Sequence, residues 1–490
     1  MVKKLIKTMF SGRIRLRYLE YVSLLILFAL ATYIIFYKLG SFPLENWDEA
    51  WLGDALRYMM RQKEYVVLYW NKAIWLDKPP LYLWLSVFFS KLLGESEFSL
   101  RLTSAISAFA LIIWVTLYSY KNFGYLPSLL AFSTLALNNV FIWRARSGNL
   151  DALSALLVFA TYFLILSKNK YRYLFLGILF SAIYMTKLSL VFFPISIFVL
   201  HDLLFQRKNL KNNLKEYLKL IVVFISIPAV WLTVGYLKIG VRFVDYYLFW
   251  SDQGVTRLAI EKFKTDYFWY AYWALQRRFF WVFLMGIILL LIKAVDSRKL
   301  LLIFFSLGLL IALSFTEKKN NWYLVPSMPF WSITIAYGAY RFIGFFKRIP
   351  FLNYFVSFMV FAFSFYVSYR TYMINIKSVI NSRAAETQAN IGKAVKQHTG
   401  EDEIIVRLDH LYPTMIYYSD RKVLSSPEDA ATGNHFLSRK DLLRKIDNGE
   451  ISYVAGKKSD LDHFRKSLRE KNSIVIVEEN DEQLVKLERL

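Results

Sequence analysis

Glu45–Tyr65, ENWDEAWLGDALRYMMRQKEY, and Trp75–Gly94, WLDKPPLYLWLSVFFSKLLG, follow an apolar segment at residues 20–38. The apolar segment is long enough to span a bilayer, which takes about 20 apolar residues in a helix. Neither later stretch has so long an apolar run, yet both repeat apolar residues at helical spacing. They therefore predict two short helices that lie along the membrane surface and hold charged groups beside the bilayer.

The composition is that of a membrane protein. Of the 490 residues, 56% are hydrophobic, 18% aromatic and 20% charged, and there is no Cys. Soluble domains have a smaller apolar share, and the lack of Cys excludes disulfides and thiolate chemistry. The net charge of +24 comes from basic residues scattered between apolar blocks, without a nucleic-acid-binding motif. We therefore assign the charge to cytoplasmic loops and anionic lipid, and predict no nucleic-acid partner.

Segments of spanning length recur along the first 370 residues. We count eleven, at residues 20–38, 98–119, 125–143, 150–167, 171–187, 188–205, 218–236, 278–293, 299–315, 323–343 and 351–370. Six basic residues and no acid precede the first, which predicts a cytoplasmic amino terminus. With this count the most basic short loops fall in the cytoplasm, while the loops 39–97 and 237–277 and the carboxyl-terminal region fall outside. The sequence thus predicts a multi-pass plasma-membrane protein.

The pattern changes near residue 371. EDEIIVRLD at 401–409, ISYVAG at 451–456 and SIVIVEE at 473–479 indicate strands, whereas residues 438–449 and 459–472 indicate helices. We therefore predict two domains. Residues 1–370 form a polytopic helical domain that includes both outer loops, and residues 371–490 form a soluble exoplasmic α/β domain.

The acidic pair Asp48-Glu49 has a structural and a functional interpretation. Asn46 can be the N-cap of the first short helix, and Glu49, three residues on, can complete a capping box. Asp48 then lies in the first turn, where the helix dipole favours a negative charge. The functional interpretation adds that an acid held ionised in this way is a base, which could take a proton from a hydroxyl group. Arg57 lies on the polar side of the same helix.

Lys78 follows Asp77 and precedes two prolines, Pro79 and Pro80. The prolines fix the backbone, end any preceding helix and suit the first turn of the next one. Lys78 is therefore a rigidly placed cation at the level of the lipid headgroups. A lysine that snorkels to a lipid phosphate explains it as well as a binding role does.

Together these residues resemble a known family. An Asp-Glu helix after the first span, then LDKPPLYLWL and SEFSLRLTSAISA, is similar to the GT-C glycosyltransferases, and within them to the aminoarabinose transferase and protein O-mannosyltransferase group. ARSGNLDAL at 145–153 and KKNNWYLVPSMP at 318–329 are further points of resemblance. By the charge count all of these stretches lie on the outer side.

The resemblance implies an inverting transfer of a sugar from a polyprenyl-phosphate donor to an acceptor. It implies that Asp48 is the general base and that Lys78, Arg257 and Tyr323 bind the donor phosphate. Supporting residues at matching or neighbouring positions are Glu49, Asp77, Arg57, Asp151 and Lys318. The family often has a His near its loop arginine, but residues 237–277 contain none, so the assignment of Arg257 is the one that departs from the pattern.

No cofactor is required for this chemistry, because cations already meet the leaving phosphate. Asp48, Glu49 and Asp77 are nevertheless acids that could collect a divalent metal. The acceptor stays open among a lipid glycan, a polysaccharide and a protein hydroxyl, and the carboxyl-terminal domain is expected to shape access to it. The alternative function is a polyprenyl-lipid flippase or another transporter, because prolines interrupt several spans.

Overall fold

The computed structural model describes residues 12–249, 266–275, 278–292, 296–315, 320–426, 435–466, 468 and 471–489. Its internal contacts divide the chain into two compact units. We call residues 1–39, 103–146 and 150–381 the helical unit, and residues 40–102, 147–149 and 382–490 the mixed unit. This division differs from the predicted boundary at residue 370, because the first outer loop is grouped with the carboxyl-terminal residues.

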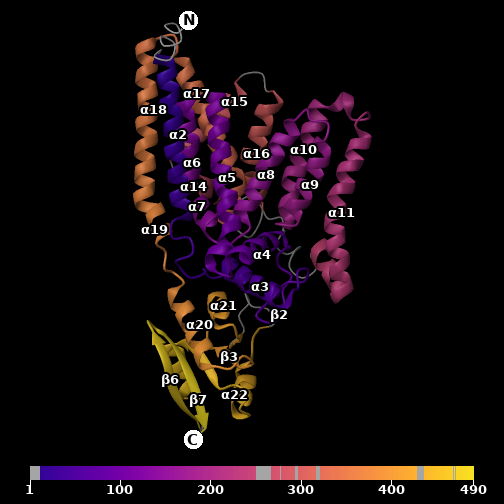
Figure 1. Ribbon diagram of the computed structural model, residues 1–490, viewed down its shortest axis with the longest axis vertical. Helices are drawn as coiled ribbons and strands as arrows, with labels where there is room; N and C mark the ends of the chain where they lie inside the picture. Colours follow the sequence, from indigo (N-terminus) through magenta and orange to yellow (C-terminus); the bar gives the residue numbers. More distant parts are fainter. Residues whose placement is uncertain are drawn as a thin grey trace. The chain divides into compact units, whose positions relative to one another are not determined.

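The helical unit consists of long helices joined by short helical turns. The helices are α2 (Gly12–Phe36), α5 (Glu97–Phe123, from residue 103), α6 (Tyr125–Ala136), α7 (Asn139–Arg146), α8 (Asp151–Leu166), α9 (Arg172–Tyr184), α10 (Phe192–Phe205), α11 (Leu214–Ile239), α14 (Asp266–Ala274), α15 (Arg278–Leu291), α16 (Ser297–Leu313), α17 (Met328–Phe345) and α18 (Pro350–Thr371). The turns are Leu188–Val191, Arg207–Asn209, α12 (Val241–Val244), Asp245–Phe249, Asn321–Ser327, Tyr372–Ile376 and α19 (Lys377–Ile380). Many of the helices run in a common direction (Figure 1).

Helices occupy each of the eleven predicted segments over most of its length. By length and composition, five of the described helices could cross a membrane, or six if the bent pair α6–α7 counts as one span. Others, such as α8, α9 and α15, are apolar but shorter. The protein is thus a membrane protein with several apolar helices, and the count of eleven stays a prediction.

One predicted span is broken in the middle. Helices α6 and α7 meet at an angle of 59°. The side-chain oxygen of Asn138 accepts a hydrogen bond from the backbone N–H of Phe141 at 3.0 Å, which starts α7 afresh. After the break, Arg144 pairs with Asp151, and Arg146 donates to carbonyl oxygens at the carboxyl-terminal end of α2.

The mixed unit contains the two predicted short helices and a sheet. Its elements are α3 (Asp48–Gln62), β1 (Tyr69–Trp70), β2 (Ala73–Ile74), α4 (Leu81–Leu93), α20 (Glu386–His398), β3 (Ile404–Arg407), α21 (Pro413–Ser419), β4 (Lys422–Ser425), α22 (Arg439–Asp447), β5 (Tyr453–Lys457), α23 (Lys458–Arg465), β6 (Lys471–Glu479) and β7 (Glu482–Arg489). The sheet order is β4-β3-β5-β7-β6, in which β3 is parallel to β4 and β5, and β7 is antiparallel to its neighbours. Of these strands, the sequence patterns indicated β3, β5 and β6.

Alternation along the strands builds a core on each face of the sheet. Ile405 and Leu484 face a cluster that includes residues of α20 and α21, whereas Val406 and Val485 face a cluster with residues of α22 and α23. Trp70, from the first outer loop, belongs to the α20–α21 cluster. This burial explains why residues 40–102 and 382–490 form one unit.

Candidate active site

Asp48 and Lys78 meet in the mixed unit. Asp48 is the first residue of α3, and Lys78 lies in the turn before α4. The ammonium of Lys78 is 3.8 Å from a carboxylate oxygen of Asp48 and 3.0 Å from one of Asp77. The side chain of Asp48 is 26% exposed, that of Lys78 is 23% exposed and that of Asp77 is 14% exposed. A small group of opposite charges is therefore held together where a ligand can reach it.

The residue before Asp48 is held in an unfavourable backbone conformation. Trp47 has φ 69° and ψ −122°, a region that non-glycine residues rarely adopt. Such a conformation costs of order 1–3 kcal/mol and persists only where neighbours fix it, often at functional sites. The direction in which α3 presents Asp48 thus depends on the packing around Trp47.

The predicted capping box is wrong. No side chain caps α3, and the side-chain oxygen of Asn46 accepts instead from the backbone N–H of Thr414 at 3.1 Å. Glu49 is buried and forms an ion pair with Arg101, whose Nε and Nη2 donate to its two oxygens at 2.7 and 2.9 Å. The N–H groups of Glu45 and Gly148 also donate to this carboxylate.

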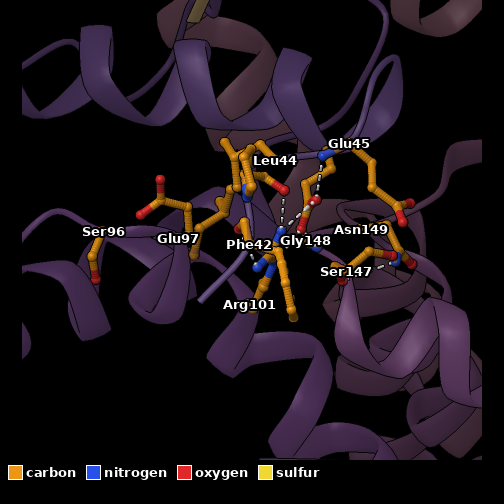
Figure 2. A network of polar contacts seen from close by, with 12 residues as sticks. Phe42, Leu44, Glu45, Ser96, Glu97, Arg101, Ser147, Gly148 and Asn149 are labelled. Carbon is orange, nitrogen blue, oxygen red and sulfur yellow. Dashed lines mark hydrogen bonds and ion pairs between the residues drawn. The ribbon is translucent and has the colours of Figure 1, made fainter. Parts of the chain in front are cut away.

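Arg101 is the centre of this network, as Figure 2 shows. It also donates to the carbonyl oxygens of Phe42 and Pro43 at 3.0 and 2.9 Å, which fixes the chain just before α3. Gly148 is required at its place, because a Cβ there would come within 2.8 Å of Leu100. Sequence reasoning found Glu49 but not its partner Arg101, which lies within the matching SEFSLRL stretch.

Arg57, predicted to support the site, serves a different contact. Its guanidinium stacks 3.8 Å from the ring centre of Tyr417 in α21 and pairs with Glu95 at 2.8 Å. Burial raises the pKa of the Tyr417 phenol to about 12, although the charge of Arg57 opposes this shift. The polar side of α3, on which Arg57 lies, therefore packs against Tyr417 of the carboxyl-terminal residues.

A second charged cluster lies in the helical unit around Asp151, the first residue of α8. Its carboxylate, 2% exposed, pairs with Arg144 at 2.6 Å and with Lys187 at 2.8 Å. The Lys187 ammonium also lies 4.9 Å from the ring centre of Tyr323. Two cations around one carboxylate leave an excess positive charge beside the Tyr323 ring, which suits an anionic ligand. The sequence pattern indicated Asp151 and Tyr323 but did not single out Arg144 and Lys187.

Arg146, two residues after Arg144, has a structural role. It donates to the carbonyl oxygens of Ile34, Ile35 and Tyr37 at 2.7, 2.8 and 2.9 Å, and so satisfies the carboxyl-terminal end of α2. Arg257 and Lys318 lie outside the described residues. Among the residues that the structure describes, no group of three or more His, Cys, Asp or Glu could hold a metal ion.

The chain is similar to several known proteins. A family model described as dolichyl-phosphate-mannose-protein mannosyltransferase matches residues 77–232. A protein of Aquifex aeolicus (strain VF5), itself described as uncharacterized, is 30% identical over 105 residues, or 21% of this chain. This match spans only 25% of that relative's length.

Solved structures match over nearly the whole chain. ArnT from Cupriavidus metallidurans bound to undecaprenyl phosphate has a TM-score of 0.76 at 14% identity, over 94% of this chain and 97% of that chain. The apo state of the same protein has a TM-score of 0.75 at 14% identity, over 95% of this chain and 98% of that chain. The Archaeoglobus fulgidus oligosaccharyltransferase in complex with zinc and sulfate has a TM-score of 0.53 at 12% identity, over 89% of this chain and 67% of that chain. At such identities these likenesses show the fold.

Proposed function

We propose that this chain, which has the GT-C fold that it shares with ArnT, is an integral-membrane glycosyltransferase. It moves a sugar from a polyprenyl-phosphate donor to an acceptor hydroxyl, with inversion at the anomeric carbon. The observation that carries the proposal is the meeting of Asp48 and Lys78, two residues chosen from separate motifs, at 3.8 Å on partly exposed side chains.

The proposed chemistry needs one base and one set of cations. The acceptor oxygen attacks the anomeric carbon and passes its proton to Asp48, while the bond between that carbon and the phosphate oxygen breaks. General base assistance of this kind contributes roughly 10²–10⁴ in rate. The phosphate leaves without protonation, so no second carboxyl group is needed, in contrast to glycoside hydrolysis.

Lys78 holds the charge that develops on the leaving phosphate, because a fixed cation at such a position stabilises the transition state. Asp77, 3.0 Å from the same ammonium, orients it. We assign Tyr323 and Arg257 to the donor phosphate as well, with Lys318 in support. The excess positive charge of the Arg144–Asp151–Lys187 cluster supports a place for Tyr323 in anion binding.

The proposed reaction requires no metal ion. The acids that could hold one are Asp48, Glu49 and Asp77, but the carboxylate of Glu49 is taken up by Arg101 and by two backbone N–H groups. The remaining two acids face the ammonium of Lys78, which repels a divalent cation. This donor set therefore does not fit a resident metal.

We place the reaction on the exoplasmic side of the plasma membrane, with the amino terminus in the cytoplasm, on the basis of the loop charges. The acceptor class is a lipid glycan, a polysaccharide or a protein hydroxyl. Residues 371–490 then lie in the compartment of the acceptor, where they can shape its access.

The proposal is tested with purified protein and the polyprenyl-linked lipid that copurifies with it. Mass spectrometry of that lipid names the sugar, and a radiolabelled form of the same lipid is then incubated with candidate acceptors. We expect the labelled sugar to appear on an acceptor. We also expect free polyprenyl phosphate to form in an equal amount. Movement of intact lipid between the leaflets of a vesicle, without cleavage, would instead establish a flippase.

A further inference from the structure

The backbone segment just before Asp48 is held by helix α21, which comes more than 360 residues later. The N–H of Leu44 donates to the phenol oxygen of Tyr418 at 3.0 Å. The hydroxyl of Thr414 donates to the carbonyl oxygen of Leu44 at 3.0 Å, and the N–H of Thr414 donates to Asn46. We call these three hydrogen bonds the α21 clamp.

Tyr418 is itself fixed from the other side. Its hydroxyl donates to a carboxylate oxygen of Glu97 at 2.6 Å. Burial and this hydrogen bond raise the pKa of the Tyr418 phenol, so the hydroxyl keeps its proton in the neutral range. The approach of α21 to α3 is close, because a Cβ added at Gly53 would meet the ring of Tyr417 at 3.2 Å. The clamp therefore belongs to a closely packed contact between α3 and α21.

The α21 clamp holds the start of α3, which no local side-chain cap fixes. No side chain caps this helix, and Trp47 sits at a positive φ that only its surroundings can maintain. Leu44 and Asn46, on which the clamp acts, are three residues and one residue before Trp47. On the premise of the proposed function, we propose that Thr414 and Tyr418 are positioning residues for the general base Asp48. The carboxyl-terminal region thus acts on the chemical step as well as on acceptor access.

The test compares Tyr418→Phe with Tyr453→Phe. Each substitution removes one phenol hydroxyl from the same unit, but Tyr453 donates to the carbonyl oxygen of His398, away from the clamp. We expect Tyr418→Phe to lower kcat roughly 10- to 100-fold with an unchanged KM for the donor, because small misplacement of a catalytic group has effects of this size. Tyr453→Phe should leave kcat within twofold of wild type. Thr414→Val should behave as Tyr418→Phe does, and Thr414→Ser should restore most of the activity.

Amide hydrogen exchange separates this inference from the proposed function. Peptides that cover residues 44–48 should exchange faster in Tyr418→Phe than in Tyr453→Phe, whether or not the protein transfers a sugar. Equal exchange, or a kcat for Tyr418→Phe within twofold of wild type, overturns the clamp. Failure of the wild-type protein to transfer any sugar overturns the proposed function and leaves the exchange result to decide the clamp.

A different feature of the helical unit carries an independent inference. A groove of about 790 Å³ lies between α9 and α11, two helices that pack against each other. At one end it is lined by three exposed lysines, Lys170, Lys215 and Lys219, and further along by apolar side chains such as Leu174 and Val222. The helices approach closely beyond that point, because a Cβ at Gly177 would lie 2.7 Å from a backbone oxygen of α11.

Each helix presents one face to this groove. On α11 the lining residues Lys215, Lys219 and Val222 follow helical spacing, so charge gives way to apolar surface along the groove. Glu216 offsets one of the three positive charges through its ion pair with Lys219 at 2.7 Å. We propose that the groove binds a phospholipid with an anionic headgroup, its phosphate at the lysines and an acyl chain over Leu174 and Val222. The loop charges place this end on the cytoplasmic side, where anionic lipids attract basic clusters.

The lipid inference is tested by native mass spectrometry of the full chain with phosphatidylglycerol, phosphatidylcholine or undecaprenyl phosphate added. We expect preferential retention of phosphatidylglycerol, lost at least tenfold in the triple variant Lys170→Gln/Lys215→Gln/Lys219→Gln. The matched control, Lys121→Gln/Lys238→Gln/Lys347→Gln, removes three exposed charges elsewhere in the unit. The lipid inference is overturned if phosphatidylcholine is retained equally well, if undecaprenyl phosphate is preferred, or if both triple variants lose the lipid equally.

Discussion

Asp48 and Asp151 are both the first residue of a helix, yet the structure treats them differently. Asp48, in the mixed unit, is 26% exposed and lies 3.8 Å from the ammonium of Lys78. Asp151, in the helical unit, is 2% exposed and contacts two cations at 2.6 and 2.8 Å. A buried carboxylate held by two cations serves to fix those cations, whereas a partly exposed carboxylate at a longer distance can exchange a proton with a ligand. Position at a helix start is therefore not enough to assign a role.

The largest expected effect separates the two acids by activity. Asp48→Asn should lower transfer by roughly 10²–10⁴, the range of general base assistance, while donor affinity and thermal stability stay near wild type. Turnover with radiolabelled donor measures this. Asp402→Asn, which changes an exposed carboxylate of the same unit, should have no effect. Turnover of Asp48→Asn close to wild type would remove the base assignment.

The next effect separates the acids by stability. Asp151→Asn leaves Arg144 and Lys187 without their buried carboxylate, and loss of one partner of a buried ion pair costs about 3–5 kcal/mol. We expect a clear fall in the thermal unfolding midpoint, which Asp48→Asn does not share. Equal midpoints for the two variants would show that burial between two cations does not give Asp151 a structural role different from that of Asp48.

Lys78→Ala should weaken donor binding by about 10- to 100-fold, because hydrogen bonds to a charged group contribute about 1.5–3 kcal/mol. Titration with undecaprenyl phosphate measures the affinity, and Lys91→Ala, an exposed lysine on α4, is the control. If the two variants bind the lipid equally well, Lys78 is a lysine that snorkels to a headgroup.

The smallest expected effect concerns a third carboxylate, Asp420, just after α21. Burial alone would raise its pKa, but a hydrogen bond from Arg61 and the charges of Arg57 and Lys396 outweigh burial and lower the pKa below the ordinary 3.8. A lowered pKa contributes stability that is present above about 3.8 and is lost as the pH falls through the folded value. Unfolding curves between pH 5 and pH 2 should therefore show a slightly steeper loss for wild type than for Asp420→Asn. Identical curves would show that these ion pairs add nothing to the packing of α3 on α21.

Local patterns in the sequence predicted much of the fold and part of the site. Hydrophobic runs located helices in all eleven predicted segments, and helical spacing located α3 and α4. The LDKPP stretch and the acidic pair led to Asp48, Asp77 and Lys78, which the structure brings together. The helix predictions succeed because helix formation depends on residues a few positions apart.

The errors have a common cause. The capping box assigned to Asn46 and Glu49 satisfied every local rule, yet Arg101 and Thr414 bind those side chains instead. Similarly, β7 and α21 were absent from the sequence patterns, and α21 holds the segment before Asp48. No local rule can weigh a capping bond against a buried ion pair formed with a residue 52 positions away.

The sequence by itself therefore determined which segments are helices, which acids begin them and which lysine the prolines hold in place. Only the tertiary structure decided which acid is buried between cations and which is partly exposed beside one of the lysines. The physical reason is that burial and charge pairing depend on side chains from distant parts of the chain, such as Lys187 beside Asp151 and Tyr418 beside Leu44. Leaving one partner of such a buried ion pair alone costs about 3–5 kcal/mol, more than the roughly 0.5–2 kcal/mol of a helix cap.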